Sequence, residues 1–258
     1  MSQRIALVTG GSRGLGRATA LALADAGVDV ILTYRTGATE AADVVSAIGA
    51  TGRRAVALPL DTTDLASHAA FAASVRTALA STWGRDTFDL LLNNAGSSGE
   101  TPLGATDADE VQRLFDVHFR SVVMLTQELL PLLADGGRVL NVSTGLTQNL
   151  VNPAYSVYAA MKGAVEVYSR YLAKSLGARG IAVNVIAPGA TATDFAGGNI
   201  RDNELYRERI AASSAMGRVG EPQDVGRAAA AILAEGMGWV TGQRIEAAGG
   251  QGMGRVAP

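Results

Sequence analysis

The chain lacks cysteine altogether and has only two lysines and two histidines among its 258 residues. Without cysteine there are no disulfide bonds and no thiolate metal sites, and we expect no metal centre. The amino-terminal segment MSQRIALVTGG has an apolar run far too short for a signal peptide or a membrane span. The formal net charge is −2 and no basic stripe is present, which argues against a nucleic acid partner. We therefore expect a soluble, cytoplasmic protein.

What the sequence does contain is a regular alternation of two kinds of segment. Hydrophobic residues make up 48% of the chain, which is enough for one large core and predicts a single domain over residues 1–258. Short β-branched apolar runs occupy residues 5–9, 28–34, 54–60, 88–94, 138–143, 181–187 and 239–247. Stretches with helical spacing between them include residues 14–26, 64–83, 107–133, 155–178 and 221–235. The pattern predicts an α/β fold, a parallel sheet covered by helices on both faces.

A glycine-rich turn follows the first apolar run. The segment TGGSRGLG, Thr9 to Gly16, has glycines at positions 10, 14 and 16 and is followed by a helical stretch. Such glycines permit a tight turn and a close backbone approach, and the free N–H groups of the next helix face an anion. The turn predicts a dinucleotide site, although its G-x3-G-x-G spacing differs from the commoner Rossmann spacing. A glycine-rich turn without a ligand is the alternative.

The end of the second apolar run indicates which dinucleotide binds. NAD sites of this architecture usually offer an acidic residue for the ribose 2′-hydroxyl about twenty residues further on. Here Tyr34 and Arg35 stand at that place, and Arg13 lies within the glycine turn. Two guanidiniums near one ribose favour a 2′-phosphate, so we predict NADP(H) over NAD(H). The alternative is that both arginines are simply solvated.

One of the two lysines, Lys162, lies four residues after Tyr158. Asn152 and Pro153 are a suitable N-cap and first-turn proline for a helix that places both side chains on one face. A free phenol has a pKa of about 10, too high for proton transfer at neutral pH, and a nearby cation lowers it. The pair is therefore a candidate proton donor with its tuning cation, unless the spacing is chance on a helix surface.

Four motifs occur in order along the chain: Thr9-Gly10-x3-Gly14-x-Gly16, Asn93-Asn94-Ala95-Gly96, Tyr158-x3-Lys162 and Pro188-Gly189. Together they resemble the short-chain dehydrogenase/reductase family, and particularly its ketoreductases, over nearly the whole chain. The resemblance implies a single Rossmann-type, doubly wound parallel sheet of about seven strands with helices on both faces. It also implies a nicotinamide cofactor and a homo-oligomer, either a tetramer or a dimer.

The resemblance also implies roles for individual residues. Tyr158 would donate the proton to the substrate carbonyl, and Lys162 would hold the nicotinamide ribose and lower the pKa of the phenol. Asp61 would contact the adenine, and Thr193 would bind the carboxamide. The predicted cofactor-binding residues are Gly10, Ser12, Arg13, Gly14, Leu15, Gly16, Tyr34, Arg35, Asp61, Thr62, Asn93, Ala95, Gly96, Tyr158, Lys162, Pro188, Gly189, Thr191 and Thr193.

Two positions depart from the family pattern. The catalytic hydroxyl, usually a serine, falls on Thr144 when the strand Asn141-Val142-Ser143-Thr144 is aligned. Thr144 precedes Tyr158 by fourteen residues, where the family more often has thirteen. A threonine hydroxyl can still donate a hydrogen bond, but the longer loop also leaves Ser143 as a candidate.

The second departure is His118, at the place of the family's catalytic asparagine. A histidine adds a group that titrates near neutrality. We expect either a proton relay through Tyr158, Lys162, water and the region of His118, or a structural histidine.

These features predict an NADPH-dependent carbonyl reductase or alcohol dehydrogenase that acts on a neutral ketone or secondary alcohol. The substrate pocket should lie between residues 145–155, which carry no charge, and residues 194–215. One alternative is a catalytically silent NADP(H)-binding regulatory or structural subunit. Another is a dehydratase or epimerase on the same scaffold. The resemblance to the family also implies a subunit interface at the helical stretches 107–133 and 155–178.

Overall fold

A seven-stranded parallel sheet forms the centre of the molecule. The computed structural model describes residues 3–150 and 152–253. The strand order is β3-β2-β1-β4-β5-β6-β7, so the predicted Rossmann-type parallel sheet is confirmed. The strands are β1 Ile5–Val8, β2 Asp29–Tyr34, β3 Ala55–Pro59, β4 Phe88–Asn93, β5 Leu133–Val142, β6 Ala182–Pro188 and β7 Arg244–Ala247.

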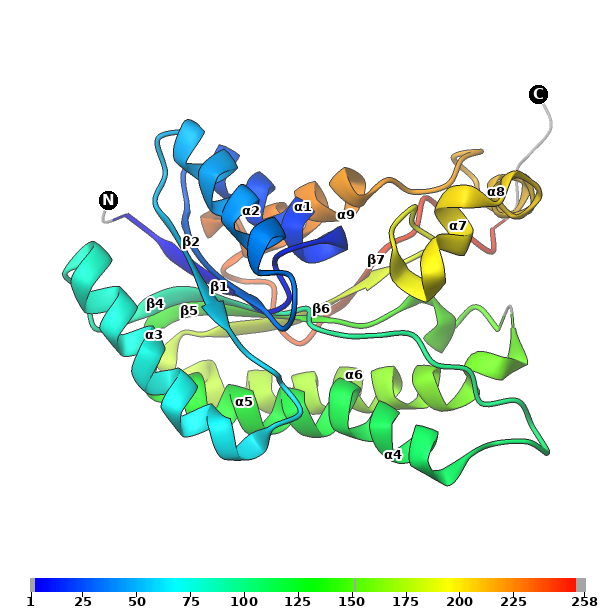
Figure 1. Cartoon of the computed structure of the whole chain (residues 1–258), viewed down its shortest axis with the longest axis horizontal. Coiled ribbons are helices and arrows are strands. Elements are labelled where there is room, and N and C mark those ends of the chain that lie inside the picture. Colours follow the sequence, from blue (N-terminus) through cyan, green and yellow to red (C-terminus); the bar gives the residue numbers. More distant parts are fainter. Residues whose placement is uncertain (1–2, 151, 254–258) are drawn as a thin grey trace.

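Helices cover both faces of the sheet (Figure 1). One face carries α1 Gly14–Asp25, α2 Ala38–Ala50 and α9 Pro222–Leu233, and the other carries α3 His68–Trp83, α4 Ala108–Phe115, α5 Ser121–Leu129 and α6 Ser156–Leu176. Alternate residues of β1 enter the two layers: Ile5 packs with α3, α5 and α6, and Ala6 packs with α1, α2 and α9. Burial on both faces explains why the apolar runs are nearly continuous.

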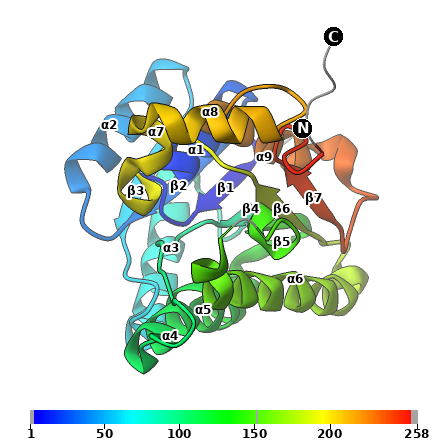
Figure 2. The same ribbon diagram turned by 90° about the vertical axis from the view of Figure 1, so that its right-hand side faces the viewer.

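The remaining short helices lie beyond the carboxyl ends of the strands. They are α7 Asn199–Asp202 and α8 Glu204–Ser213, and both views place them over this edge of the sheet (Figures 1 and 2). The predicted irregular segment 188–203 runs from the end of β6 into α7. Ala196 within it adopts a φ of 54°, a left-handed conformation that is unusual for a residue with a side chain.

Three elements differ from the sequence prediction. The strand expected over residues 138–143 begins already at Leu133. The helix expected over residues 107–133 is divided by a π-helical turn, Asp116–Arg120, between α4 and α5. The strand expected to begin at Trp239 begins only at Arg244, because Gly242 turns the chain with a φ of 72°. Within the described residues, no helix is long and apolar enough to cross a membrane, and no group of acidic or histidine side chains could hold a metal ion.

Candidate active site

The glycine turn and the turn after β4 are joined by hydrogen bonds. Asn94 Nδ2 donates to Thr9 O at 2.9 Å and to Gly10 O at 3.1 Å. The Thr9 hydroxyl oxygen accepts from the backbone N–H groups of Asn94 and Ala95 at 2.9 and 3.0 Å. The backbone of the turn is therefore fixed from the neighbouring strand. Asn94 was absent from the predicted site residues, although it lies in a motif that identified the turn.

The glycine turn leaves room for backbone and for little else. A Cβ atom at Gly16 would lie 2.2 Å from Gly10 O and 2.5 Å from Asn94 Nδ2. Gly10 and Gly14 adopt positive φ angles of 66° and 55°. Arg13, the N-cap of α1, makes no side-chain capping hydrogen bond, and the first turn of this helix has no acidic residue. A twelve-residue helix whose first turn is open and free of negative charge fits the diphosphate of a dinucleotide.

The two arginines predicted to bind the 2′-phosphate are both exposed. Arg13 precedes α1, and Arg35 follows β2, close enough to Asp61 to lower the pKa of that carboxyl group. Burial opposes the shift at Asp61, but hydrogen bonds from Thr63 make the net change in its pKa downward. One feature here was not predicted: a Cβ at Gly37 would lie 3.0 Å from Glu40 Oε2 and 3.4 Å from Ser12 Oγ. The Glu40 carboxylate therefore lies near Gly37, which follows Arg35 by two residues.

The other predicted cofactor residues lie at the carboxyl ends of the strands. Thr62, Asn93 and Ala95 line one small pocket. The amide of Asn93 itself is engaged in the core, where Nδ2 donates to Thr126 Oγ1 at 2.9 Å and to Asn141 Oδ1 at 2.8 Å. Most of the remaining members of the set are half-buried or buried: Leu15, Tyr34, Pro188, Gly189, Thr191 and Thr193, whereas Gly96 is exposed. Thr193 lies against the glycine turn, 3.9 Å from a Cβ at Gly14.

Tyr158 and Lys162 lie one helical turn apart on α6, and both are buried. As predicted, Asn152 caps the turn that starts this helix, accepting from Ala154 N at 3.0 Å. Lys162 Nζ donates to Val142 O at 2.8 Å, and burial lowers the lysine pKa to about 8. Burial raises the pKa of Tyr158, contrary to the lowering expected from the lysine. The reason is that desolvation dominates and the ammonium is directed at a backbone carbonyl.

The two candidate hydroxyls have different partners. A hydrogen bond with Thr144 lowers the pKa of Tyr158, partly opposing the effect of burial. The Thr144 oxygen also accepts from Leu146 N at 3.3 Å, so its own hydrogen remains available for donation. Ser143 Oγ instead donates to Glu166 Oε1 at 2.6 Å. The structure therefore brings Thr144, and not Ser143, to the phenol.

His118 lies in the π-helical turn against Tyr158, with the two rings edge-to-face and their centroids 4.9 Å apart. Its Nε2 donates to Ser97 O at 2.7 Å, which leaves Nδ1 as the unprotonated nitrogen. Burial, followed by the charge of Lys162, lowers the pKa of His118 to about 2. The expectation that this residue titrates near neutrality is therefore wrong, because a cation at this position would be desolvated beside another cation. Nδ1 is one of two buried side-chain polar atoms without a partner among the described residues.

Aromatic side chains surround the phenol. The rings of Tyr155 and Phe195 lie 6.3 and 6.0 Å from that of Tyr158, measured between centroids. Phe195 remains 39% exposed and belongs to the segment that leads to α7. The space in front of Tyr158 therefore has aromatic walls, as well as a hydroxyl from Thr144.

This arrangement has counterparts in known proteins. A family model described as Enoyl-(Acyl carrier protein) reductase matches residues 10–251, almost the whole chain. The chain belongs to the short-chain dehydrogenase/reductase family. Members of this family are NAD(P)-dependent oxidoreductases that act on carbonyl or alcohol groups. The hydroxynaphthalene reductase-like protein Arp2 of Metarhizium brunneum is 32% identical over 261 residues, which cover 97% of this chain and 95% of that protein.

Two solved short-chain dehydrogenase/reductase structures superpose closely on the chain. The promiscuous reductase LugOII, which catalyses keto-reduction at C1 during lugdunomycin biosynthesis, has a TM-score of 0.90 and 35% identity, with 96% of this chain and 98% of LugOII covered. The angucycline C-6 ketoreductase LanV with bound NADP has a TM-score of 0.90 and 33% identity, with 97% of this chain and 96% of LanV covered.

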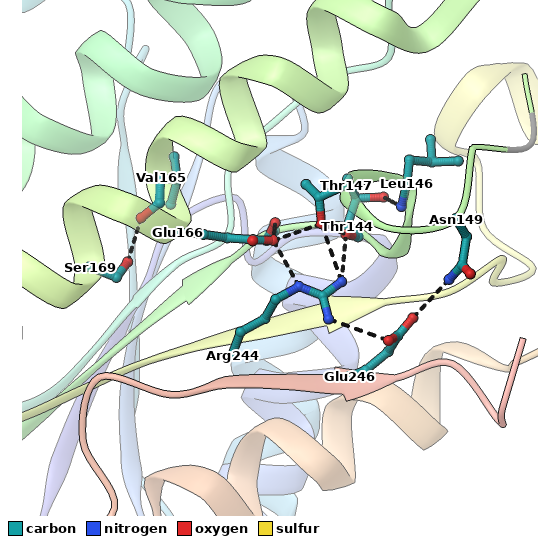
Figure 3. Close-up of polar contacts among 10 residues, drawn as sticks. Thr144, Leu146, Thr147, Asn149, Val165, Glu166, Ser169, Arg244 and Glu246 are labelled. Carbon is teal, nitrogen blue, oxygen red and sulfur yellow. Dashed lines mark hydrogen bonds and ion pairs between the residues drawn. The ribbon is translucent and has the colours of Figure 1, made fainter. Parts of the chain in front are cut away.

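Sequence reasoning missed one more part of this site, a cluster around Arg244 and Glu166 (Figure 3). Both residues contact the segment that carries Thr144. Glu166 follows Lys162 by four residues, as Lys162 follows Tyr158, so all three share one face of α6. This regular spacing could have indicated Glu166 from the sequence.

Proposed function

We propose that this protein is an NADPH-dependent ketoreductase that reduces a neutral cyclic ketone to a secondary alcohol. The observation that carries the proposal is the meeting of Tyr158, Thr144 and Lys162 at the carboxyl edge of the sheet. A phenol and a hydroxyl directed at one place can both donate hydrogen bonds to a carbonyl oxygen and stabilise the negative charge that develops there.

The glycine turn fits the cofactor, and the adjoining residues complete its site. The N–H groups of the first turn of α1 would hold the diphosphate, Arg13 and Arg35 the 2′-phosphate, and Lys162 the nicotinamide ribose. NADPH, when bound, supplies the hydride for the ketone carbon.

The protonation states of this chain suit reduction. Because burial raises the pKa of Tyr158, the phenol carries its proton at neutral pH and is the proton donor. Thr144 supplies its one hydroxyl hydrogen to the same carbonyl oxygen, because its oxygen is the acceptor in its contact with Leu146 N. Lys162, whose pKa is lowered to about 8, lies one helical turn from the phenol on the same face of α6. His118 stays neutral and serves as an aromatic wall.

The walls of the site favour a ring-shaped substrate. Tyr155, Phe195 and His118 offer flat or edge-on aromatic surfaces around the phenol, and residues 145–155 carry no charge. LanV is described as an angucycline C-6 ketoreductase, LugOII by keto-reduction at C1 during lugdunomycin biosynthesis, and Arp2 as a hydroxynaphthalene reductase-like protein. A neutral ketone fused to an aromatic ring is therefore the substrate class that we propose.

The test is NADPH oxidation with a bicyclic aryl ketone, 1-tetralone, compared with an acetoacetyl thioester. We expect turnover of the tetralone and formation of its alcohol, which distinguishes reduction from dehydration or epimerisation. Tyr158→Phe should bind NADPH as the wild type does and lose about 100-fold or more in kcat, the usual contribution of a general acid. Tight NADPH binding without oxidation of any ketone would instead indicate a silent binding protein, and wild-type turnover by Tyr158→Phe would remove the phenol from the mechanism.

A further inference from the structure

An ion pair lies directly behind the hydroxyl-bearing segment and has no part in the chemistry proposed above. Arg244, on β7, and Glu166, on α6, are joined by a 2.9 Å contact between Nε and Oε1. Their side chains are only 14% and 17% exposed. Figure 3 shows both directed at the chain that follows β5, where Thr144 and Thr147 lie. Paired charges this deep require a well-organised set of partners.

Glu166 extends the row formed by Tyr158 and Lys162. The three residues follow one another at intervals of four on α6, so they share one face of the helix. Each contacts the same short segment: Tyr158 contacts the Thr144 side chain, Lys162 donates to Val142 O, and Glu166 accepts from Ser143 Oγ. The helix thus supports residues 142–147 along three consecutive turns.

The contacts of Glu166 determine which group receives the hydroxyl hydrogen of Ser143. Oε1 of Glu166 lies 2.6 Å from Ser143 Oγ and 2.9 Å from Thr147 Oγ1. A hydroxyl has one hydrogen, and a carboxylate can only accept, so Ser143 donates its hydrogen to Glu166. Ser143 is therefore a tether, and its hydroxyl is not a second donor for a substrate.

Arg244 holds the same segment from the other side. Its Nη2 donates to Thr144 O at 3.3 Å and to Thr147 Oγ1 at 3.2 Å. Its Nη1 lies 3.3 Å from Glu246 Oε2, and the other oxygen of Glu246 accepts from Asn149 Nδ2 at 3.1 Å. The guanidinium therefore connects β7 with the backbone of Thr144 and, through Glu246, with the end of the loop 145–149.

We propose that Arg244 and Glu166 are positioning residues, which hold residues 143–149 so that the Thr144 hydroxyl stays directed at Tyr158. This inference rests on the proposed reductase function. Within its own turn, the Thr144 hydroxyl oxygen accepts a hydrogen bond from Leu146 N at 3.3 Å, so its orientation depends on where the backbone of this segment is held. The segment from Thr144 to Tyr158 is one residue longer than in the family pattern. A longer segment needs more contacts to fix its conformation, and Arg244 and Glu166 supply them.

The first experiment compares Arg244→Met, Arg244→Lys and a matched control under single-turnover conditions with 1-tetralone. We expect Arg244→Met to lower the rate of reduction roughly tenfold to a hundredfold, because a small displacement of a reacting group has such an effect. The Kd for NADPH should stay unchanged, and Arg244→Lys should recover part of the rate. The control is Arg85→Met, which removes an arginine paired with Asp89 at 2.9 Å and similarly buried near the start of β4. It should keep the wild-type rate.

The second experiment separates positioning from general loss of structure by a double-mutant cycle. If Arg244 acts through Thr144, then Arg244→Met should cause no further loss in a Thr144→Ala background. The same loss in both backgrounds would overturn the proposal, as would a wild-type rate in Arg244→Met. If Arg244→Met does not fold, Glu166→Gln tests the same cluster, since the amide keeps the shape and removes the charge. Glu166→Gln should then reduce the rate when Thr144 is present and have no effect in the Thr144→Ala background.

Tyr158→Phe distinguishes failure of this inference from failure of the reductase assignment. A variant Tyr158→Phe that reduces the ketone normally would contradict the assignment itself. An inactive Tyr158→Phe together with a fully active Arg244→Met would contradict only the positioning role.

Discussion

His118 is kept neutral by its surroundings, and this makes the folded state sensitive to acid. Its pKa is about 2 in the folded chain and about 6.5 in an unfolded one. Between these values the unfolded state binds a proton that the folded state cannot, so stability falls as pH falls below 6.5. The loss from His118 amounts to about 2 kcal/mol between about pH 7 and about pH 5.

His118→Asn should therefore lose about 2 kcal/mol less than the wild type between those two pH values, measured by urea denaturation. His68→Asn is the matched control, because His68 is also buried and also hydrogen-bonds a carbonyl, Thr62 O at 3.0 Å. His68→Asn should lose the same stability from His118 between these pH values as the wild type does. Equal acid sensitivity of His118→Asn and the wild type would show that the imidazole is not the group responsible.

Arg13 and Arg35, which we propose bind the 2′-phosphate, permit a test of the proposed preference for NADPH. Arg35→Asp should shift the ratio of kcat/KM for NADPH and NADH toward NADH by roughly tenfold or more, the value of one charge-assisted hydrogen bond. Glu40→Gln should act in the opposite direction, because Glu40 Oε2 lies near Gly37 and Ser12 and repels a phosphate there. A preference that neither substitution changes would show that this side of the turn does not read the 2′ position.

The sequence predicted the placement of those residues that depends on local spacing. The glycine turn and the Tyr158–Lys162 pair are examples, since turn geometry and helix periodicity act over a few residues. The partners of Ser143 and Arg244 could not be predicted, because Glu166 and Thr144 are brought to them only by the packing of α6 and β7 around β5. The depressed pKa of His118 likewise depends on burial, which the sequence does not display.

Among whole elements, the glycine turn is the one most sensitive to a single methyl group. Gly16→Ala would place a carbon atom 2.2 Å from Gly10 O. This carbonyl oxygen is held in place because it accepts a hydrogen bond from Asn94 Nδ2. We expect a loss of about 1–3 kcal/mol in stability, typical of overpacking, together with weaker NADPH binding. Thermal denaturation and NADPH titration measure the two effects.

The matched control for this substitution is Gly49→Ala. Gly49 lies within α2, and apart from its chain neighbours and the nearby backbone of this helix, no atom of the described residues comes within 4 Å of an added Cβ. Alanine should raise stability there by about 0.5–1 kcal/mol, because it restricts the unfolded chain and favours the helix. If Gly16→Ala were equally well tolerated, the close approach between the two turns would not matter.

The hydrophobic pattern predicted the strands and helices better than it predicted the places where a helix is interrupted. Nearly continuous apolar runs located all seven strands, since both faces of the sheet are covered. The π-helical turn at His118 was not predicted, because such turns are rare and occur inside helices that otherwise continue. This turn places the imidazole against Tyr158, so the interruption lies where it shapes the site.

For the whole molecule, α6 offers a surface suited to a second copy of the chain. Ala160, Ala164, Val167 and Tyr171 follow one another at helical spacing, and all are exposed or half-exposed. Met124 on neighbouring α5 is also partly exposed. Small and apolar residues in such a row let two helices approach closely, and a surface of this kind can pair with itself across a two-fold axis. We therefore predict that the protein is a dimer or a tetramer built through α5 and α6.

Val167→Glu tests this interface, because Val167 is 45% exposed and lies in the middle of the row. A buried, unpaired carboxylate on both sides of a two-fold contact is strongly unfavourable, so the variant should have the mass of a monomer in light scattering. Ala73→Glu adds the same charge to the exposed face of α3 and should leave the mass of the wild type unchanged. An oligomeric Val167→Glu would place the contact on another face, and a monomeric wild type would contradict the predicted assembly.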